Sequence, residues 1–340
     1  MLCLAGALTW SCSGTIDPEG EDTQLILSAD HTEIVADGRS EVTFTVTYGV
    51  QDVSSTAMIS CISGQADIKG NKFTTTEEGT YRFTATYNGK TSNETIVTAL
   101  APLESRFERN VCVMEFTGTW CSQCPSGAVA LNFMVEESYK GKAYALAFHN
   151  DDIYAIPQEQ DLYKKFKVGG YPGYVTDMRD VGLLTTGGCS TSIERSLYET
   201  ETHCGAALRC EASENADGSM KVSATAKVFS EKEMKYMLAA YIIEDKIKGE
   251  QNLGDKIDKD YTHRHVVRKM LSSTIMGDDL GVIKTEKEAE KKYEFTIDSQ
   301  WNAENLSLAV LVIDENGQVN NMAICKCLNG EMAYEMKNKE

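Results

Sequence analysis

The 340-residue sequence predicts a multidomain α+β protein, with a β-sandwich-like domain on either side of a central α/β domain. Before residue 100, apolar and polar residues alternate with the period of a half-buried strand. Strand and helix signals then follow one another up to about residue 200, as they do in α/β layer structures. Strand signals return from residue 204 onward. We therefore expect four parts, which comprise residues 1–22, 23–101, 104–202 and 203–334.

The first part, residues 1–22, is expected to be a signal and anchor segment followed by a tether. Its apolar run is about ten residues long, whereas a membrane-spanning helix takes about 20. Cys12, preceded by Ser11, resembles the lipidation site of a bacterial lipoprotein, and an acidic stretch follows it. We expect a lipid on Cys12 to anchor the protein to a membrane of the cell envelope. The alternative is an N-terminus that is merely hydrophobic and frayed.

Residues 23–101 carry the strongest strand pattern. EVTFTVTY and TYRFTATY alternate apolar and polar residues, and Asn88-Gly89 supplies a tight hairpin turn after the second run. Several short strands in a segment of this size predict a small β-sandwich. Through ADGRSEVTFTVT and EEGTYRFTATYNGKTS the segment resembles the immunoglobulin-like modules of bacterial surface proteins. That resemblance implies a spacer or a binding surface.

Residues 104–202 change in character. NVCVMEF is a nearly continuous apolar run, as expected of a strand buried on both faces. A helix is predicted over 126–139, with Val129, Phe133 and Met134 as its apolar positions. KAYALAFHN reads as a second buried strand and 158–168 as a second helix. The Gly-rich GGYPG then leads into a further strand.

Residues 203–334 return to strand signals. MKVSATAKVF, KYMLAAYIIED and YEFTIDS are predicted strands, and LSLAVLVIDENGQVNNMAICKCL is predicted to form a closing pair. The stretch over 246–281 is polar and irregular, so we expect a long insertion there. Together these patterns predict a second sandwich-like domain.

Of the eleven cysteines in the sequence, Cys121 and Cys124 are the pair whose spacing indicates a chemical mechanism. They follow a predicted strand at the start of a predicted helix, where unpaired N–H groups and the helix dipole stabilise an anion. A thiolate there has a lowered pKa, and only the thiolate attacks a disulfide. We expect Cys121 to be the nucleophile. Cys124, one turn further on, can then resolve a mixed disulfide.

Two further residues are candidates for the same site. Glu115 lies in an apolar strand, where burial raises the pKa of a carboxyl group, so it can accept and return the proton of Cys124. Its alternative is an edge position paired with a lysine. Pro172 is a candidate for a cis peptide bond that turns the Tyr171 backbone towards the pocket mouth, where a substrate strand can pair. Its alternative is an ordinary trans-proline turn.

The stretch EFTGTWCSQC is similar to the active-site stretch of the thioredoxin superfamily, including the acidic residue six positions before the first cysteine. GYP matches the position of that superfamily's cis-proline, and the similarity covers residues 107–180. It departs at Ser122-Gln123, which leaves the direction of electron flow open. The resemblance implies a thioredoxin-like domain. It implies that Cys121, Cys124 and Glu115 are catalytic. It also implies that Trp120, Tyr171 and Pro172 bind the substrate.

The whole arrangement also resembles the outer-membrane lipoproteins of Gram-negative bacteria of the twenty-eight-kilodalton type. FTGTWCSQCP, the GYP turn and YTHRHVVRKML carry this resemblance. It implies a location at the outer membrane and a C-terminal β domain joined to the redox core. Whether the protein faces the periplasm or the cell surface stays open.

Several other functions are disfavoured. The net charge of −18 and the lack of a basic stripe argue against a nucleic-acid partner. A zinc site built on Cys121 and Cys124 needs two more ligands. Cys325 and Cys327 are possible further ligands, but the redox interpretation fits the context better. We therefore expect neither metal nor cofactor. Cys325 and Cys327 share a strand face, so they pair with Cys204 or Cys210 or remain buried thiols.

His263 and His265 would share a face if they lie in one strand. They can start a metal site or border the thiol pocket, but a structural role is favoured because no acidic or thiol partner has a known metal-site spacing. The sequence as a whole leads to the hypothesis of an envelope thiol–disulfide oxidoreductase acting on protein disulfides. The alternative is a surface binding lipoprotein that uses the central domain as a non-catalytic scaffold.

Overall fold

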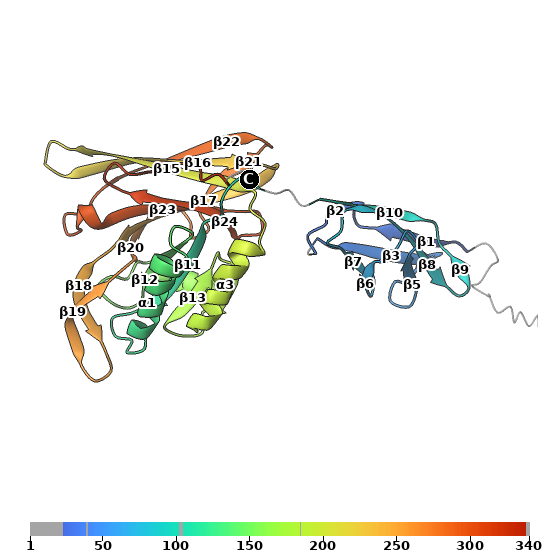
Figure 1. Cartoon of the computed structure of the whole chain (residues 1–340), viewed down its shortest axis with the longest axis horizontal. Coiled ribbons are helices and arrows are strands. Elements are labelled where there is room, and N and C mark those ends of the chain that lie inside the picture. The colour runs from blue at the N-terminus through green and yellow to red at the C-terminus, as the bar shows by residue number, and fades with distance from the viewer. Residues whose placement is uncertain (1–22, 39, 102–104, 184, 338–340) are drawn as a thin grey trace, which may run out of the picture. The chain divides into compact units, whose positions relative to one another are not determined.

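The computed structural model describes residues 23–38, 40–101, 105–183 and 185–337. The predicted anchor, with Cys12, lies outside the described residues. The chain divides into two compact units, Met1–Leu103 and Glu104–Glu340, which are coloured blue to cyan and green to red in Figure 1.

The first unit consists of two five-stranded sheets around one core. One sheet has the order β1-β3-β7-β6 with β4 paired to β3, and the other has β2-β10-β8-β5 with β9 paired to β8. Phe44, Phe73 and Phe83 are fully buried between them, and the Phe83 ring centroid lies 4.7 Å from that of Phe44. The strands are β1 Leu25–Ala29, β2 Glu33–Val35, β3 Val42–Tyr48, β4 Gln51–Asp52, β5 Met58–Cys61, β6 Asp67–Lys69, β7 Lys72–Thr74, β8 Gly79–Tyr87, β9 Lys90–Thr91 and β10 Thr95–Leu100.

The second unit is organised by a nine-stranded sheet with the order β14-β13-β11-β12-β20-β17-β23-β24, in which β21 also pairs with β17. β11 and β12 are parallel, whereas β13 pairs with β11 in the antiparallel sense. The strands are β11 Val111–Thr117, β12 Ala143–His149, β13 Gly173–Thr176, β14 Asp180–Leu183, β17 Met234–Glu244, β20 Val266–Met270, β21 Asp278–Ile283, β23 Leu306–Ile313 and β24 Val319–Lys326.

Other elements cover both faces of this sheet. The helices α1 Cys124–Phe133 and α3 Thr186–Tyr198 lie in front of β11 and β13 in Figure 1, and the π-helix η1 Met134–Ser138 continues α1. The helix α2 Glu159–Lys165 packs Leu162 into the core on the opposite face. Since both faces are covered, every residue of β11 and β23 is buried, which explains their continuous apolar runs.

A four-stranded sheet with the order β22-β16-β15-β25 packs against β17, β23 and β24 and encloses a separate core. It lies at the top of the second unit in Figure 1. A third, two-stranded sheet consists of the hairpin β18–β19. The bounds are β15 Cys204–Glu214, β16 Met220–Ser230, β18 Ile247–Asn252, β19 Ile257–His263, β22 Lys287–Thr296, the 3₁₀ turn η2 Ala303–Asn305 and β25 Glu331–Met332.

The predicted fold class is wrong. We expected a multidomain α+β protein with an immunoglobulin-like sandwich, a central thioredoxin-like α/β domain and a C-terminal sandwich. The chain is mostly β, with 49% strand and 12% helix in several sheets and no clear central α/β fold of the expected kind. The physical reason is the parallel contact of β12 with β20 at Ala147 and Val266, which joins the strands of the two expected domains into one sheet.

The predicted helix over 126–139 also differs in detail. It starts earlier, at Cys124, and changes to π-helix at Met134. Val129 and Phe133, which were expected to face the core, are 67% and 63% exposed, and Leu131 is buried instead. The exposed apolar pair leaves this helix with an apolar outer surface.

A buried ion pair fixes the end of the nine-stranded sheet. Arg109 Nη2 lies 2.8 Å from Asp177 Oδ2, with both side chains almost fully buried. Arg109 also donates to the backbone oxygens of Val319 and Asn320, and the second oxygen of Asp177 accepts from Cys112 N. The pair therefore connects the start of β11 with the end of β13 and the start of β24.

We expect Asp177→Ala to lower the free energy of unfolding by about 3–5 kcal/mol, because it leaves the Arg109 charge buried and unpaired. Urea denaturation of the full chain measures this. Lys227→Ala, which breaks the half-exposed pair with Glu288, is the control and should cost less than about 1 kcal/mol. Equal losses in the two variants would contradict the assigned role of Asp177.

Candidate functional site

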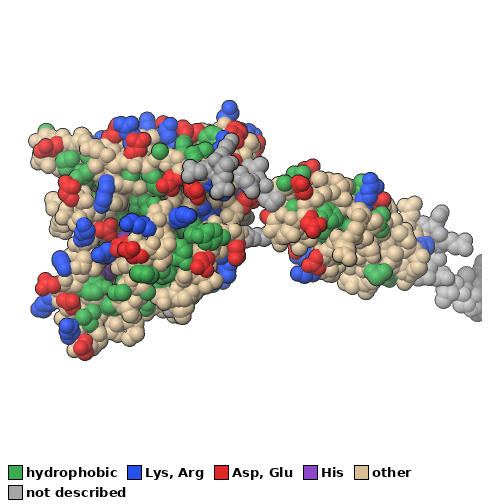
Figure 2. All heavy atoms as spheres, viewed as in Figure 1, with side chains coloured by type: hydrophobic (Ala, Val, Ile, Leu, Met, Phe, Trp, Pro, Cys, Tyr) green, Lys and Arg blue, Asp and Glu red, His purple; other side chains and the backbone are tan. Residues whose placement is uncertain are grey.

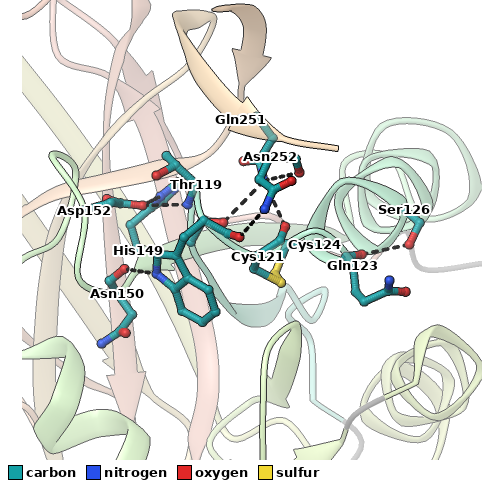
Figure 3. The surroundings of a disulfide bond; sticks show 12 residues. Thr119, Cys121, Gln123, Cys124, Ser126, His149, Asn150, Asp152, Gln251 and Asn252 are labelled. Atoms are coloured by element: carbon teal, nitrogen blue, oxygen red, sulfur yellow. Dashed lines mark hydrogen bonds and ion pairs between the residues drawn. A yellow bond between two sulfur atoms is a disulfide. The ribbon is translucent and has the colours of Figure 1, made fainter. Parts of the chain in front are cut away.

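Cys121 and Cys124 form a disulfide between the end of β11 and the start of α1, with their Cα atoms 5.4 Å apart (Figure 3). Cys124 is the first residue of the helix, whereas Cys121 lies in the preceding turn, where its N–H donates to Gly118 O. Cys121 keeps 6% of its surface exposed and Cys124 2%. Cys121 is therefore the more accessible of the two.

Glu115 lies beneath the disulfide on β11, opposite Tyr174 of β13 and Ala147 of β12. It is 4% exposed, and its Oε1 has no hydrogen-bond partner among the described residues. Burial raises the pKa of Glu115 to about 8, so the carboxyl group is mostly protonated at neutral pH. Glu115 therefore does not lie at a sheet edge paired with a lysine, which was the alternative expectation.

A small cavity connects the carboxyl group with the disulfide. Its volume is about 20 Å³, which is enough for about one water molecule. Glu115 and Cys124 line it together with His149, Gln251 and His263. One water in this cavity can therefore carry a proton between Glu115 and Cys124.

Two histidines also line this cavity. His149 of β12 has Nδ1 2.7 Å from Asp152 Oδ2, and its ring lies 5.4 Å from that of His263. Burial, and next His149, lower the pKa of His263 to about 4, so its imidazole is neutral at neutral pH. Within the described ranges, no group of three or more potential ligands is arranged for a metal ion.

His263 and His265 do not lie in one strand, so they do not share a strand face. β19 ends at His263, β20 begins at Val266, and His265 lies between them with a positive φ of 55°. His263 therefore borders the cavity, whereas His265 lies near Asp245, with its Nδ1 3.3 Å from that carboxylate.

The aromatic residue Trp120, which directly precedes Cys121, packs against Tyr171. Trp120 is 44% exposed, and its Nε1 donates to Asn150 O at 2.8 Å. The Tyr171 ring meets it edge-on at 5.3 Å, and the Tyr171 hydroxyl donates to Glu159. The Tyr171–Pro172 peptide bond is cis, as the sequence analysis expected.

Gly127 allows helix α1 to lie directly on this proline. A Cβ atom at Gly127 would lie 2.3 Å from the Tyr174 hydroxyl and 2.9 Å from Pro172 Cγ. Real Cβ atoms do not approach other atoms this closely, so only glycine fits. The close contact brings the cis-proline and the helix that starts at Cys124 together.

The β18–β19 hairpin contributes to the site in a way that the sequence did not reveal. Gln251 Nε2 donates to Cys121 O at 3.0 Å, and Asn252 donates through its side chain to Trp120 O and through its backbone to Thr119 O. Figure 3 shows both side chains reaching the loop from the hairpin strand. This segment had been expected to be an irregular insertion, because an exposed polar hairpin has no apolar alternation to reveal it.

The structure thus gathers the six predicted residues around one disulfide: Cys121, Cys124, Glu115, Trp120, Tyr171 and Pro172. Figure 2 shows acidic and basic side chains interspersed over the face in view.

A family model described as outer membrane protein Omp28 matches residues 159–327. HBP35 of Porphyromonas gingivalis is a similar solved structure, with a TM-score of 0.54 and 19% identity, over 69% of this chain and 81% of that one. At this identity the likeness concerns the fold alone. The Yersinia pseudotuberculosis adhesin InvE reaches a TM-score of only 0.19 at 7% identity, over 88% of this chain and 57% of that one, and carries no argument. No curated protein matches the chain significantly.

The protein is located in the cell envelope, at the outer membrane, as the sequence predicted. None of the helices within the described residues is long and apolar enough to cross a bilayer. The comparisons give no support to the thioredoxin and immunoglobulin-like resemblances.

We expect the stability gained by Glu115→Gln to grow with pH. Between about pH 4.5 and pH 8 the folded chain keeps the Glu115 proton, whereas the unfolded chain has lost it, so wild-type stability falls as pH rises. Relative to wild type, the variant should gain about 4 kcal/mol across this window. Urea titrations at pH 5 and pH 8 measure it, with exposed Glu137→Gln as the control. A difference that is the same at both pH values would refute the buried, protonated carboxyl group.

Gln251→Ala should make the disulfide easier to reduce. The substitution leaves the buried Cys121 oxygen without its side-chain donor, which costs about 1 kcal/mol of local stability and makes opening of the loop about fivefold more frequent. The rate of reduction by dithiothreitol, followed by thiol alkylation, measures this. Lys256→Ala at the exposed hairpin tip is the control, and equal rates in both variants would contradict a holding role for Gln251.

Proposed function

We propose that the protein exchanges thiols and disulfides with other proteins at the outer membrane through Cys121 and Cys124. The observation that carries this proposal is the cavity shared by the disulfide and the buried Glu115 carboxyl group. A disulfide that serves only to stabilise the fold needs no titratable group beneath it, and a buried carboxyl group with a free oxygen is costly.

In the reducing direction the thiolate of Cys121 attacks a sulfur of the partner's disulfide. One partner sulfur leaves as a thiolate, and a mixed disulfide joins the partner to Cys121. Cys124 then loses its proton and attacks the Cys121 sulfur, which closes the Cys121–Cys124 bond and releases the second partner sulfur as a thiolate. Two electrons pass from this chain to the partner, and the same steps in reverse oxidise a partner dithiol.

Glu115 is the proton carrier in this proposal. Its raised pKa of about 8 is close to that of an ordinary thiol, about 8.5, so a proton moves between Cys124 and Glu115 with little change in free energy. The water-sized cavity provides the path. When a partner thiolate opens the disulfide at Cys121, protonated Glu115 neutralises the departing Cys124 thiolate.

The partner is expected to bind as an extended segment at the mouth formed by Trp120, Tyr171 and Pro172. Trp120 offers an exposed apolar ring next to the reactive sulfur. On the other side, the hairpin side chains Gln251 and Asn252 already occupy the carbonyl oxygens of Cys121 and Trp120. A lipid on Cys12 would tether this site to the membrane.

A second candidate function is binding without catalysis. It is favoured by the exposed Val129 and Phe133, which lie four residues apart on α1 and form an apolar surface. In that case the Cys121–Cys124 bond would stay closed and serve to hold the start of the helix.

The two candidates are separated by the reduction potential and by trapping. We expect a potential above about −300 mV and a stable mixed disulfide when Cys124→Ser is mixed with a disulfide-containing protein such as insulin. Cys121→Ser should trap nothing and lose insulin reductase activity. Cys61→Ser, which removes a half-buried thiol of the first unit, is the control and should behave as wild type. A potential below that value, with no trapping by Cys124→Ser, would reject redox exchange.

A further inference from the structure

Cys210 and Cys325 bring two thiols together far from the Cys121–Cys124 loop in sequence. Cys210 lies on β15 of the four-stranded sheet and Cys325 on β24 of the nine-stranded sheet. Their sulfur atoms are 3.6 Å apart, although 115 positions separate the residues. Both side chains are buried, with 1% and 8% of their surfaces exposed.

The backbone holds this arrangement in place from both sides. β25, which follows β24 after a short turn, pairs with β15 at Leu208, and Cys210 N donates to Gly330 O at 2.8 Å. Towards the other end of β24, Asn321 Nδ2 donates to Cys204 O at 2.8 Å. The two strands are therefore fixed relative to one another along their length, and the contact between the sulfurs is part of the packing.

We propose that Cys210 and Cys325 form a second disulfide in the mature protein, which cross-links the two sheets. The sulfurs need to approach by about 1.5 Å to reach the bond length of about 2.05 Å. The outer-membrane location is compatible with such a bond, since exported proteins fold in an oxidising compartment. This proposal is independent of the proposed function of Cys121 and Cys124.

The reaction is a two-electron oxidation. Two S–H bonds break, one S–S bond forms, and the two protons pass to solvent. The two electrons, and by way of solvent the two protons, pass to a protein disulfide of an exported thiol oxidant, which leaves as a dithiol. Since both thiols are inaccessible in the folded chain, the bond forms while the two sheets are still closing.

Two other cysteines near the pair have different surroundings. Cys327 lies two residues beyond Cys325 and is fully buried, and among the described residues the thiol hydrogen bond of Cys210 is with Cys325 and not with Cys327. Cys204 donates its thiol hydrogen to Asn320 Oδ1 at 3.4 Å. Cys325 is thus the partner that geometry assigns to Cys210.

Trypsin separates every alternative pairing. Cleavage after Arg209 and Lys326 places Cys210 in residues 210–221, Cys325 in 293–326, Cys327 in 327–337 and Cys204 in 196–209. The experiment uses the full chain exported to the envelope, quenched with N-ethylmaleimide under denaturing, non-reducing conditions and mapped by mass spectrometry. We expect a cross-linked peptide of 210–221 with 293–326. It should disappear in Cys325→Ser and persist in Cys327→Ser.

A second measurement tests the cross-link through stability. In the Cys121→Ser/Cys124→Ser background, a reductant should lower the melting temperature by several degrees, and adding Cys325→Ser should abolish that response. Recovery of Cys210 and Cys325 as maleimide adducts in the wild-type protein would overturn the proposal, as would a cross-link from Cys210 to Cys204 or Cys327. Because the mapping uses the wild-type chain, it decides the matter even if a variant fails to fold.

Discussion

A carboxyl group buried beneath a disulfide is the constraint on which the site depends. Glu115 is placed on a strand that is covered on both faces, so its carboxyl group is favoured in the protonated form. A hydrophobic residue at this position would satisfy the packing of β11 better. Burying a carboxyl group there costs free energy. This cost is explained if Cys124, which lines the same water-sized cavity as Glu115, needs the proton that Glu115 holds.

The site is assembled from segments that lie far apart in the sequence. β11 provides Glu115, the turn before α1 provides the cysteines, the cis peptide bond before β13 provides the mouth, and the β18–β19 hairpin fixes the loop through Gln251. These segments meet because one nine-stranded sheet runs through the second unit. The buried Arg109–Asp177 pair and the proposed Cys210–Cys325 bond stabilise other regions of the same sheet.

The sequence predicted local elements well where burial imposes a clear period. The alternating runs of β3 and β8 and the continuous runs of β11, β12 and β23 lie where expected. The fold class was wrong because strand pairing between distant segments leaves no local trace, and the β12–β20 contact at Ala147 is of this kind. Gln251 was missed because it is a polar residue in an exposed hairpin, and its buried side chain is evident only from the three-dimensional contact with Cys121 O.

The central claim is that Glu115 carries the proton of Cys124, and the direct measurement is the titration of the Glu115 carboxyl carbon by ¹³C NMR in the oxidised and reduced protein. The account predicts a carboxyl group that stays protonated at pH 7 in the oxidised form, with a midpoint near 8. In the reduced form, this midpoint should shift when Cys124 is replaced by serine. A Glu115 that ionises below about pH 6, or one whose titration ignores Cys124, would contradict the account.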